Sequence, residues 1–81
     1  MDPKQSRMAR AGLGWRAADL AEAAGIGSAT VARFELGRPV EESSVAKMRS
    51  ALEAAGAGFT HRKGKVGVAV PDQDDPHDPK R

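Results

Sequence analysis

The sequence predicts a mainly α-helical fold of four to five helices, followed by a short C-terminal β-hairpin or strand and a disordered tail. Apolar residues recur at helical spacing over residues 1–58, and glycines interrupt this pattern where helices would end. Apolar and polar residues alternate over residues 59–70, as in strands. Residues 71–81 are polar and rich in proline and aspartate, a composition typical of disorder. These three segments define the predicted organisation of the chain.

The first helix is expected at about residues 4–13. Pro3 stands at its start and Gly14 directly after its end, where these residue types are most often found around helices. Met8 is expected to face the core, with Arg7 and Arg10 in water.

The next two helices are expected within residues 17–36, AADLAEAAGIGSATVARFEL. Gly25 interrupts two apolar stripes and can adopt the positive φ that ends a helix, which lets Ile26 reach the core. The earlier helix covers about residues 16–24, and the later one runs from Ser28 to a stop at Gly37. A turn this short makes the two helices cross steeply. Four residues of the later helix then point away from the protein: Ser28, Ala29, Ala32 and Arg33.

A fourth helix is expected at about residues 42–55, ended by Gly56, and a hairpin with a Lys63-Gly64 turn follows it. The resulting core is small and gives only marginal stability, so dimerisation or partner binding would help. The expected core residues are Met8, Leu13, Trp15, Leu20, Ala24, Ile26, Val31, Phe34, Val45, Met48 and Leu52.

Composition excludes several classes of protein. There is no cysteine, so neither a disulfide nor thiolate chemistry is possible. His61 and His77 lie in different segments without ligand spacing, and we expect no metal and no cofactor. No nucleophile has a positioned base, so we do not expect an enzyme. No apolar run approaches membrane-spanning length and the N-terminal residues do not resemble a signal peptide, which predicts a cytoplasmic protein with no membrane partner.

Positive charge is unevenly distributed along the chain. The first segment, up to residue 58, has eight basic and seven acidic residues, for a net charge of +1. The hairpin segment adds Arg62, Lys63 and Lys65, and the tail carries four aspartates against two basic residues. A net charge of +1 is small for a protein that neutralises many phosphates, so charge alone only weakly indicates a nucleic-acid partner.

Residues 8–56 resemble the Cro/repressor-type helix-turn-helix family, small bacterial and phage regulators also called the XRE family. The resemblance implies a helix-turn-helix fold, and it is more specific for fold than for activity. The motifs that carry it are Leu13-Gly14-Trp15, Asp19-Leu20-Ala21-Glu22, Ala24-Gly25-Ile26, Thr30-Val31-Ala32-Arg33-Phe34-Glu35 and Ala51-Leu52-Glu53-Ala54-Ala55-Gly56.

By this resemblance the later helix of the pair enters the major groove of double-stranded DNA. Arg33 is its one long cationic donor, suited to a guanine edge or a phosphate. Thr30 either contacts DNA or caps its own helix. The expected DNA-binding residues are Arg16, Ser28, Ala29, Thr30, Arg33 and Arg38.

The chain departs from the DNA-binding members of the family at two places. Those members often open the earlier helix with Ser-Gln, where this chain has Arg16 and Ala17. They often begin the later helix with Gln, Arg, Lys or Asn, where this chain has Gly27, Ser28 and Ala29. Direct base readout would therefore be sparse. A purely structural alternative for Arg33 is an exposed residue paired with Glu35 or another nearby acid.

The hairpin has two interpretations. Its apolar face can pair with a second copy or with another protein, or it can fold back onto the fourth helix of its own domain. Likewise, Arg62, Lys63 and Lys65 fit either a basic finger for DNA or a solvated hairpin tip. The expected partner or dimer interface consists of Phe59, Val66, Val68 and Val70.

Two functions follow as hypotheses. The first is a small transcriptional regulator that binds DNA, as a dimer whose half-sites lie about one helical turn apart. The second is an antiactivator or antitoxin-like module of the same fold, which masks a larger transcriptional activator and reads DNA weakly or not at all.

Overall fold

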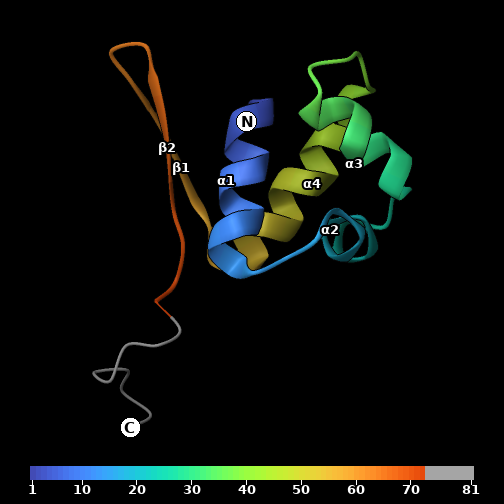
Figure 1. Ribbon diagram of the computed structural model, residues 1–81, viewed down its shortest axis with the longest axis horizontal. Helices are drawn as coiled ribbons and strands as arrows, with labels where there is room; N and C mark the ends of the chain where they lie inside the picture. The colour runs from blue at the N-terminus through green and yellow to red at the C-terminus, as the bar shows by residue number, and fades with distance from the viewer. Residues whose placement is uncertain (73–81) are drawn as a thin grey trace, which may run out of the picture.

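The computed structural model describes residues 1–72, which form four helices and one two-stranded antiparallel sheet (Figure 1). This confirms a small, mainly helical fold with a C-terminal hairpin. The prediction of a disordered tail concerns residues 73–81 for the most part, and these lie outside the described residues. The elements are α1 (Pro3–Leu13), α2 (Ala17–Ala24), α3 (Ser28–Glu35), α4 (Glu42–Ala54), β1 (Gly58–Arg62) and β2 (Lys65–Ala69).

Helix α1 begins with a capping box. The Asp2 carboxylate accepts a hydrogen bond from the backbone N–H of Gln5 at 3.0 Å, and the Gln5 side chain accepts one from the backbone N–H of Asp2 at 3.0 Å. The helix ends at Gly14, whose φ of 72° places it in the left-handed region. Both ends of α1 are therefore fixed by local hydrogen bonds and backbone geometry.

The corner between α2 and α3 has the predicted form. Gly25 has a φ of 72°, and its N–H donates to the carbonyl of Glu22 at 3.2 Å. The N–H of Ile26 donates to the carbonyl of Ala21 at 3.0 Å, which completes a Schellman motif. Ile26 is half-buried against the core, as its predicted position requires. The chain thus turns between two separate helices at this glycine.

The core lies between all four helices and the hairpin. Its fully buried larger side chains come from three of the helices: Leu20 from α2, Val31 from α3, and Met48 and Leu52 from α4. Most of the predicted core is confirmed, either buried or packed against the buried cluster. The predicted residues in these positions are Leu13, Trp15, Leu20, Ala24, Ile26, Val31, Phe34, Val45, Met48 and Leu52.

The orientation of α1 about its axis differs from the prediction. Met8 is 41% exposed, while Gln5, Ser6, Ala9 and Leu13 are buried. The expectation that Met8 belongs to the core is therefore wrong. Residues 5, 9 and 13 follow one another at intervals of four and share one face of the helix. Two polar residues can occupy this face because partners elsewhere in the chain satisfy their hydrogen bonds.

The hairpin pairs β1 with β2 and places Phe59 opposite Val68 and His61 opposite Val66. Lys63 and Gly64 form its two-residue turn, with φ values of 51° and 76°. Two positive φ angles define a type I′ turn, the geometry that suits the twist of a tight hairpin. Figure 1 shows the hairpin lying along α1, with its turn reaching beyond the N-terminal end of that helix.

Candidate functional site

The inner side of α3 is fixed to α1 by a buried carboxylate. Glu35, the last residue of α3, is 9% exposed. It accepts hydrogen bonds from the Ser6 hydroxyl at 2.5 Å and from Arg10 Nη2 and Nε at 2.6 and 2.9 Å. Arg7 also donates to the backbone carbonyl of Glu35. Three residues of α1 therefore hold the C-terminal end of α3.

The same contacts change the ionisation of Glu35. Burial raises the pKa of its carboxyl group, but hydrogen bonds from Arg10 and Ser6 and the charges of Arg10 and Arg7 lower it by more. The net pKa lies below the ordinary value of 4.5, so Glu35 is ionised at neutral pH. The bond to Glu35 in turn raises the pKa of Arg10. The expectation that Arg10 lies free in water is wrong, because its side chain is only 20% exposed and its guanidinium is paired with Glu35.

The outer side of α3 is open. Ser28, Ala29, Ala32 and Arg33 are all exposed, as predicted from the steep crossing of the helices. Three of these four side chains are small, so the backbone of α3 can come close to any surface that it meets.

Thr30 lies at the margin of this face and is half-buried. The alternative that it caps its own helix is wrong, because α3 has no side-chain cap and its N-cap residue is Gly27. Thr30 instead borders a shallow depression of about 460 Å³ at the start of α4, together with Arg33, Pro39, Val40, Glu41 and Ser44.

Arg33 and Arg38 are exposed, and within residues 1–72 neither has an ion pair or a side-chain hydrogen bond. The alternative that Arg33 pairs with Glu35 is wrong. Residues two apart point to nearly opposite sides of a helix, and Glu35 is held by Ser6 and Arg10 on the inner side. Both arginines are therefore available to an anionic partner.

Arg16 is placed differently from the other predicted contacts. Its Nη2 and Nε donate to the Asp19 carboxylate at 3.1 and 3.2 Å, and its backbone N–H donates to the same carboxylate at 2.8 Å. Hydrogen bonds from Arg16 hold the pKa of Asp19 below its usual range, and the same pairing raises the pKa of Arg16. Arg16 remains 81% exposed. A phosphate contact by Arg16 would have to share this guanidinium with Asp19.

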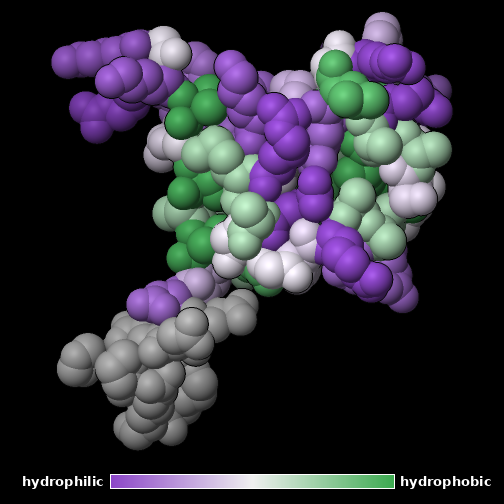
Figure 2. Space-filling model, viewed as in Figure 1, coloured by the Kyte–Doolittle hydropathy of each residue, from purple (hydrophilic) through white to green (hydrophobic). Residues whose placement is uncertain are grey.

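The predicted partner residues of the hairpin contact their own domain. Phe59, Val68 and Val70 pack against the core, and Val66 is half-buried. Of the two interpretations, folding back onto the same domain is the one found, but the covering helix is chiefly α1 instead of the fourth helix: a Cβ atom on Gly12 of α1 would lie 2.6 Å from a methyl group of Val70. Figure 2 shows hydrophobic residues along this junction. The apolar face is thus largely used within the chain.

The contact between α1 and the hairpin includes a buried amide that the sequence analysis missed. Gln5 is 4% exposed, and its Nε2 donates to the carbonyls of Thr60 and Gly67 at 2.9 and 3.2 Å. Phe59 also lies under the guanidinium of Arg49, 5.3 Å from ring centroid to Cζ. These contacts anchor both strands to the helical domain.

Leu36 is a second feature that the sequence analysis missed. It follows α3 directly and is 71% exposed, more than any other large hydrophobic residue in the described part of the chain. Neither helical periodicity nor turn chemistry at this position signals an exposed leucine. It lies two residues before Arg38 in the loop that leads to α4.

Comparison of the sequence with protein-family models and with curated proteins gives no match. Within residues 1–72 no group of His, Asp and Glu side chains is arranged to hold a metal ion. No helix in the same range combines the length and the apolar character needed to cross a membrane.

Proposed function

We propose that this protein is a small helix-turn-helix transcriptional regulator that binds double-stranded DNA through the outer face of α3. The observation that carries the proposal is the contrast between the two sides of this helix. Its inner side is fixed by Glu35 and the core, and its outer side is exposed and makes no ion pair or side-chain hydrogen bond within the described residues. A rigidly held helix with an open outer side, following a tight turn, is the arrangement that enters a major groove.

The chemistry of the outer face suits modest binding. Arg33 can donate two hydrogen bonds to the major-groove edge of a guanine or to a phosphate. Arg38, in the loop after α3, is suited to a backbone phosphate. Ser28, Ala29 and Ala32 allow close approach and supply a hydroxyl donor and methyl groups. We therefore expect few base contacts and binding that weakens strongly with salt.

The test is a fluorescence-anisotropy titration at low salt, with a duplex covering the region upstream of the protein's own gene and a random duplex of equal length. We expect a preference for the upstream duplex. Arg33→Ala should weaken that binding by roughly tenfold or more, the effect of losing one base-contacting arginine. Lys47→Gln on α4 is the matched control for charge and should bind as the wild type does. Equal binding of both duplexes, or an unaffected Arg33→Ala variant, would contradict the proposal.

A second candidate is a protein-binding antiactivator of the same fold. Leu36 favours it, because a large exposed hydrophobic side chain beside a face of small residues is more typical of a protein contact than of a DNA contact. On this account Leu36→Ser would abolish the recovery of a transcriptional activator in a pull-down and leave DNA binding unchanged. Recovery of nucleic acid alone would speak against it.

Dimerisation remains part of the DNA-binding proposal, but the contact between the two copies differs from the one expected from the sequence. Because the valines of the hairpin pack on α1, a second copy would have to pair with a free edge of the two-stranded sheet. Sedimentation equilibrium with and without DNA tests this. A dimer should form in solution or on a duplex with two half-sites, and a strict one-to-one complex on such a duplex would exclude it.

A further inference from the structure

The turn of the hairpin gathers positive charge at one end of the molecule. Residues 58–70 contain three basic and no acidic side chains, whereas residues 1–57 carry eight basic and seven acidic ones. The three, Arg62, Lys63 and Lys65, are all exposed, and none has an ion pair within residues 1–72. We refer to them as the hairpin tip.

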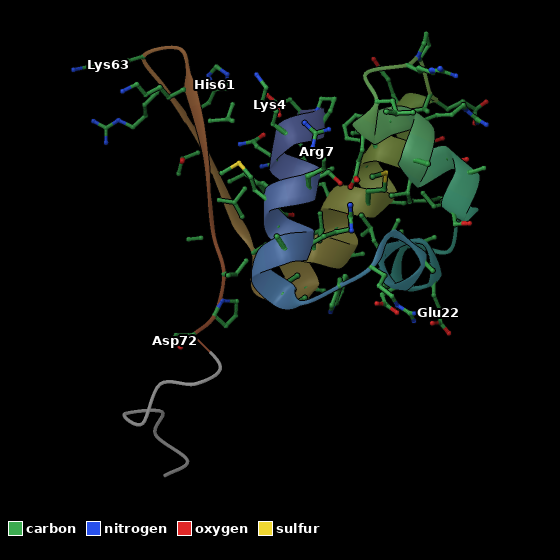
Figure 3. All side chains as sticks on the ribbon, viewed as in Figure 1. Lys4, Arg7, Glu22, His61, Lys63 and Asp72 are labelled. Atoms are coloured by element: carbon green, nitrogen blue, oxygen red, sulfur yellow. The ribbon has the colours of Figure 1, made fainter. Side chains whose placement is uncertain are left out.

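The hairpin tip lies at the same end of the molecule as the start of α1. Figure 3 shows Lys4 at the N-terminal end of α1, at the same end of the molecule as His61 and Lys63, whereas Arg7 lies on the side of α1 that faces α3. In Figure 2 hydrophilic side chains cover this end of the hairpin and of α1. One further cation, Lys4 of α1, therefore lies at the same end of the molecule as the hairpin tip.

Two features of the tip are unfavourable for the hairpin itself. Lys63 has a φ of 51°, the one positive φ of a non-glycine residue in the described part of the chain. The first position of a type I′ turn strongly favours asparagine, aspartate or glycine over lysine. Arg62 and Lys65 lie directly opposite each other in the ladder, where like charges repel. A turn with Asn-Gly and an oppositely charged pair would be more stable, so stability does not account for these residues.

We propose that the hairpin tip is a second DNA contact, which binds backbone phosphates outside the groove that α3 enters. This inference rests on the proposed function. Three unpaired cations on a projecting turn are complementary to a row of phosphates, and a backbone contact needs no base-reading groups. The local violations of turn and pairing preferences are then the cost of placing charge at the tip. The tip also compensates for the nearly neutral helical domain.

The proposal predicts that stability and binding change in opposite directions. Lys63→Asn supplies the residue that the turn prefers, and Lys65→Glu turns the repulsive pair with Arg62 into an attractive one. Both variants should melt at the wild-type temperature or above it. Both should bind duplex DNA several-fold more weakly at low salt, and Lys63→Asn should reduce the slope of log K against log salt by about 0.9, the contribution of one phosphate contact.

The experiment measures melting temperature and the salt dependence of binding to a 20-base-pair duplex for the wild type, the two tip variants, Arg33→Ala and Lys47→Gln. Lys47→Gln removes one charge from α4 and should leave the slope unchanged. Tip variants that keep the wild-type affinity and slope, while Arg33→Ala binds weakly, would overturn the tip contact and leave the proposed function standing. Tip variants that bind weakly, beside an unaffected Arg33→Ala, would support the tip contact and contradict the role of α3. A wild type that does not bind at all would refute both.

An acidic protein segment is the other partner that a cationic tip fits, and competition distinguishes it. We expect poly-L-glutamate to displace the duplex only at a large excess of charge. The assignment to DNA would be overturned if poly-L-glutamate displaced the duplex at an equal concentration of negative charge and if the tip variants bound poly-L-glutamate as weakly as they bind DNA.

Discussion

The two sides of α3 differ in what they contact and in what they present to solvent. The inner side places Val31 and Phe34 in the core and ends on Glu35, which bonds to Ser6 and Arg10. The outer side carries small residues and one unpaired arginine, Arg33. The residues that hold α3 in place therefore lie on one side of the helix, and the residues that it presents to a partner lie on the other. The inner side can therefore be tested by stability and the outer side by binding.

The largest expected effect comes from breaking the inner side. Glu35→Ala removes the acceptor of Ser6 and Arg10, which leaves the buried Ser6 hydroxyl without a partner and Arg10 with only the Trp15 carbonyl. We expect a loss of about 3 kcal/mol in the free energy of unfolding, measured by urea denaturation.

The triple variant Ser6→Ala/Arg10→Met/Glu35→Leu is the control for this change, because it replaces all three bonded side chains with apolar residues. It should recover most of the loss. If Glu35→Ala unfolds at the same urea concentration as the wild type, the carboxylate does not hold α3.

A smaller effect is expected where α1 holds the hairpin. Gln5→Ala removes the donor to the carbonyls of Thr60 and Gly67, and the free energy of unfolding should fall by about 1–2 kcal/mol. Amide exchange should accelerate in β1 and β2 more than in α3. Asp2→Ala, which removes only the cap of α1, is the control and should leave exchange in the strands nearly unchanged. Equal acceleration in all elements would show that Gln5 has no specific link to the hairpin.

The smallest effect is the dependence of stability on pH. The pKa of Glu35 is lower in the folded protein than its ordinary value of 4.5, so its contribution is complete above that value and is lost as the pH falls through the folded pKa. The melting temperature of the wild type should therefore drop as the pH falls below about 4.5. Glu35→Gln should melt lower at pH 7 and show a flatter profile. A variant profile parallel to that of the wild type would assign the acid sensitivity to other carboxylates.

Much of the fold follows from sequence patterns, because those patterns act locally. Gly25 ends α2 through its own backbone conformation, and Lys63-Gly64 sets the length of the hairpin turn. The buried polar residues that the sequence analysis missed are buried because of hydrogen-bond partners that lie far away along the chain. Gln5 and Ser6 have the polarity of surface residues, and their burial becomes favourable only when Thr60, Gly67 and Glu35 accept their hydrogen bonds.

The same reason explains the two errors on α1. Met8 is more apolar than its neighbours, but the partners of Gln5 and Ser6 and the close approach of Val70 to Gly12 turn another face of α1 inward. Arg10 then meets Glu35 instead of water. For α3 the sequence was sufficient, because the steep crossing of α2 and α3 determines which residues of α3 are exposed. The identity of the molecule that binds these exposed residues does not follow from helical spacing.

The most direct test of the central proposal is a chemical-shift perturbation experiment, in which a short DNA duplex is added to the isotope-labelled protein. We predict shifts concentrated at Ser28, Ala29, Ala32, Arg33 and Arg38, with the amides of Ser6 and Glu35 on the inner side nearly unmoved. A spectrum in which residues 28–38 stay unchanged at saturating DNA would contradict the assignment of the outer face of α3 as the binding surface.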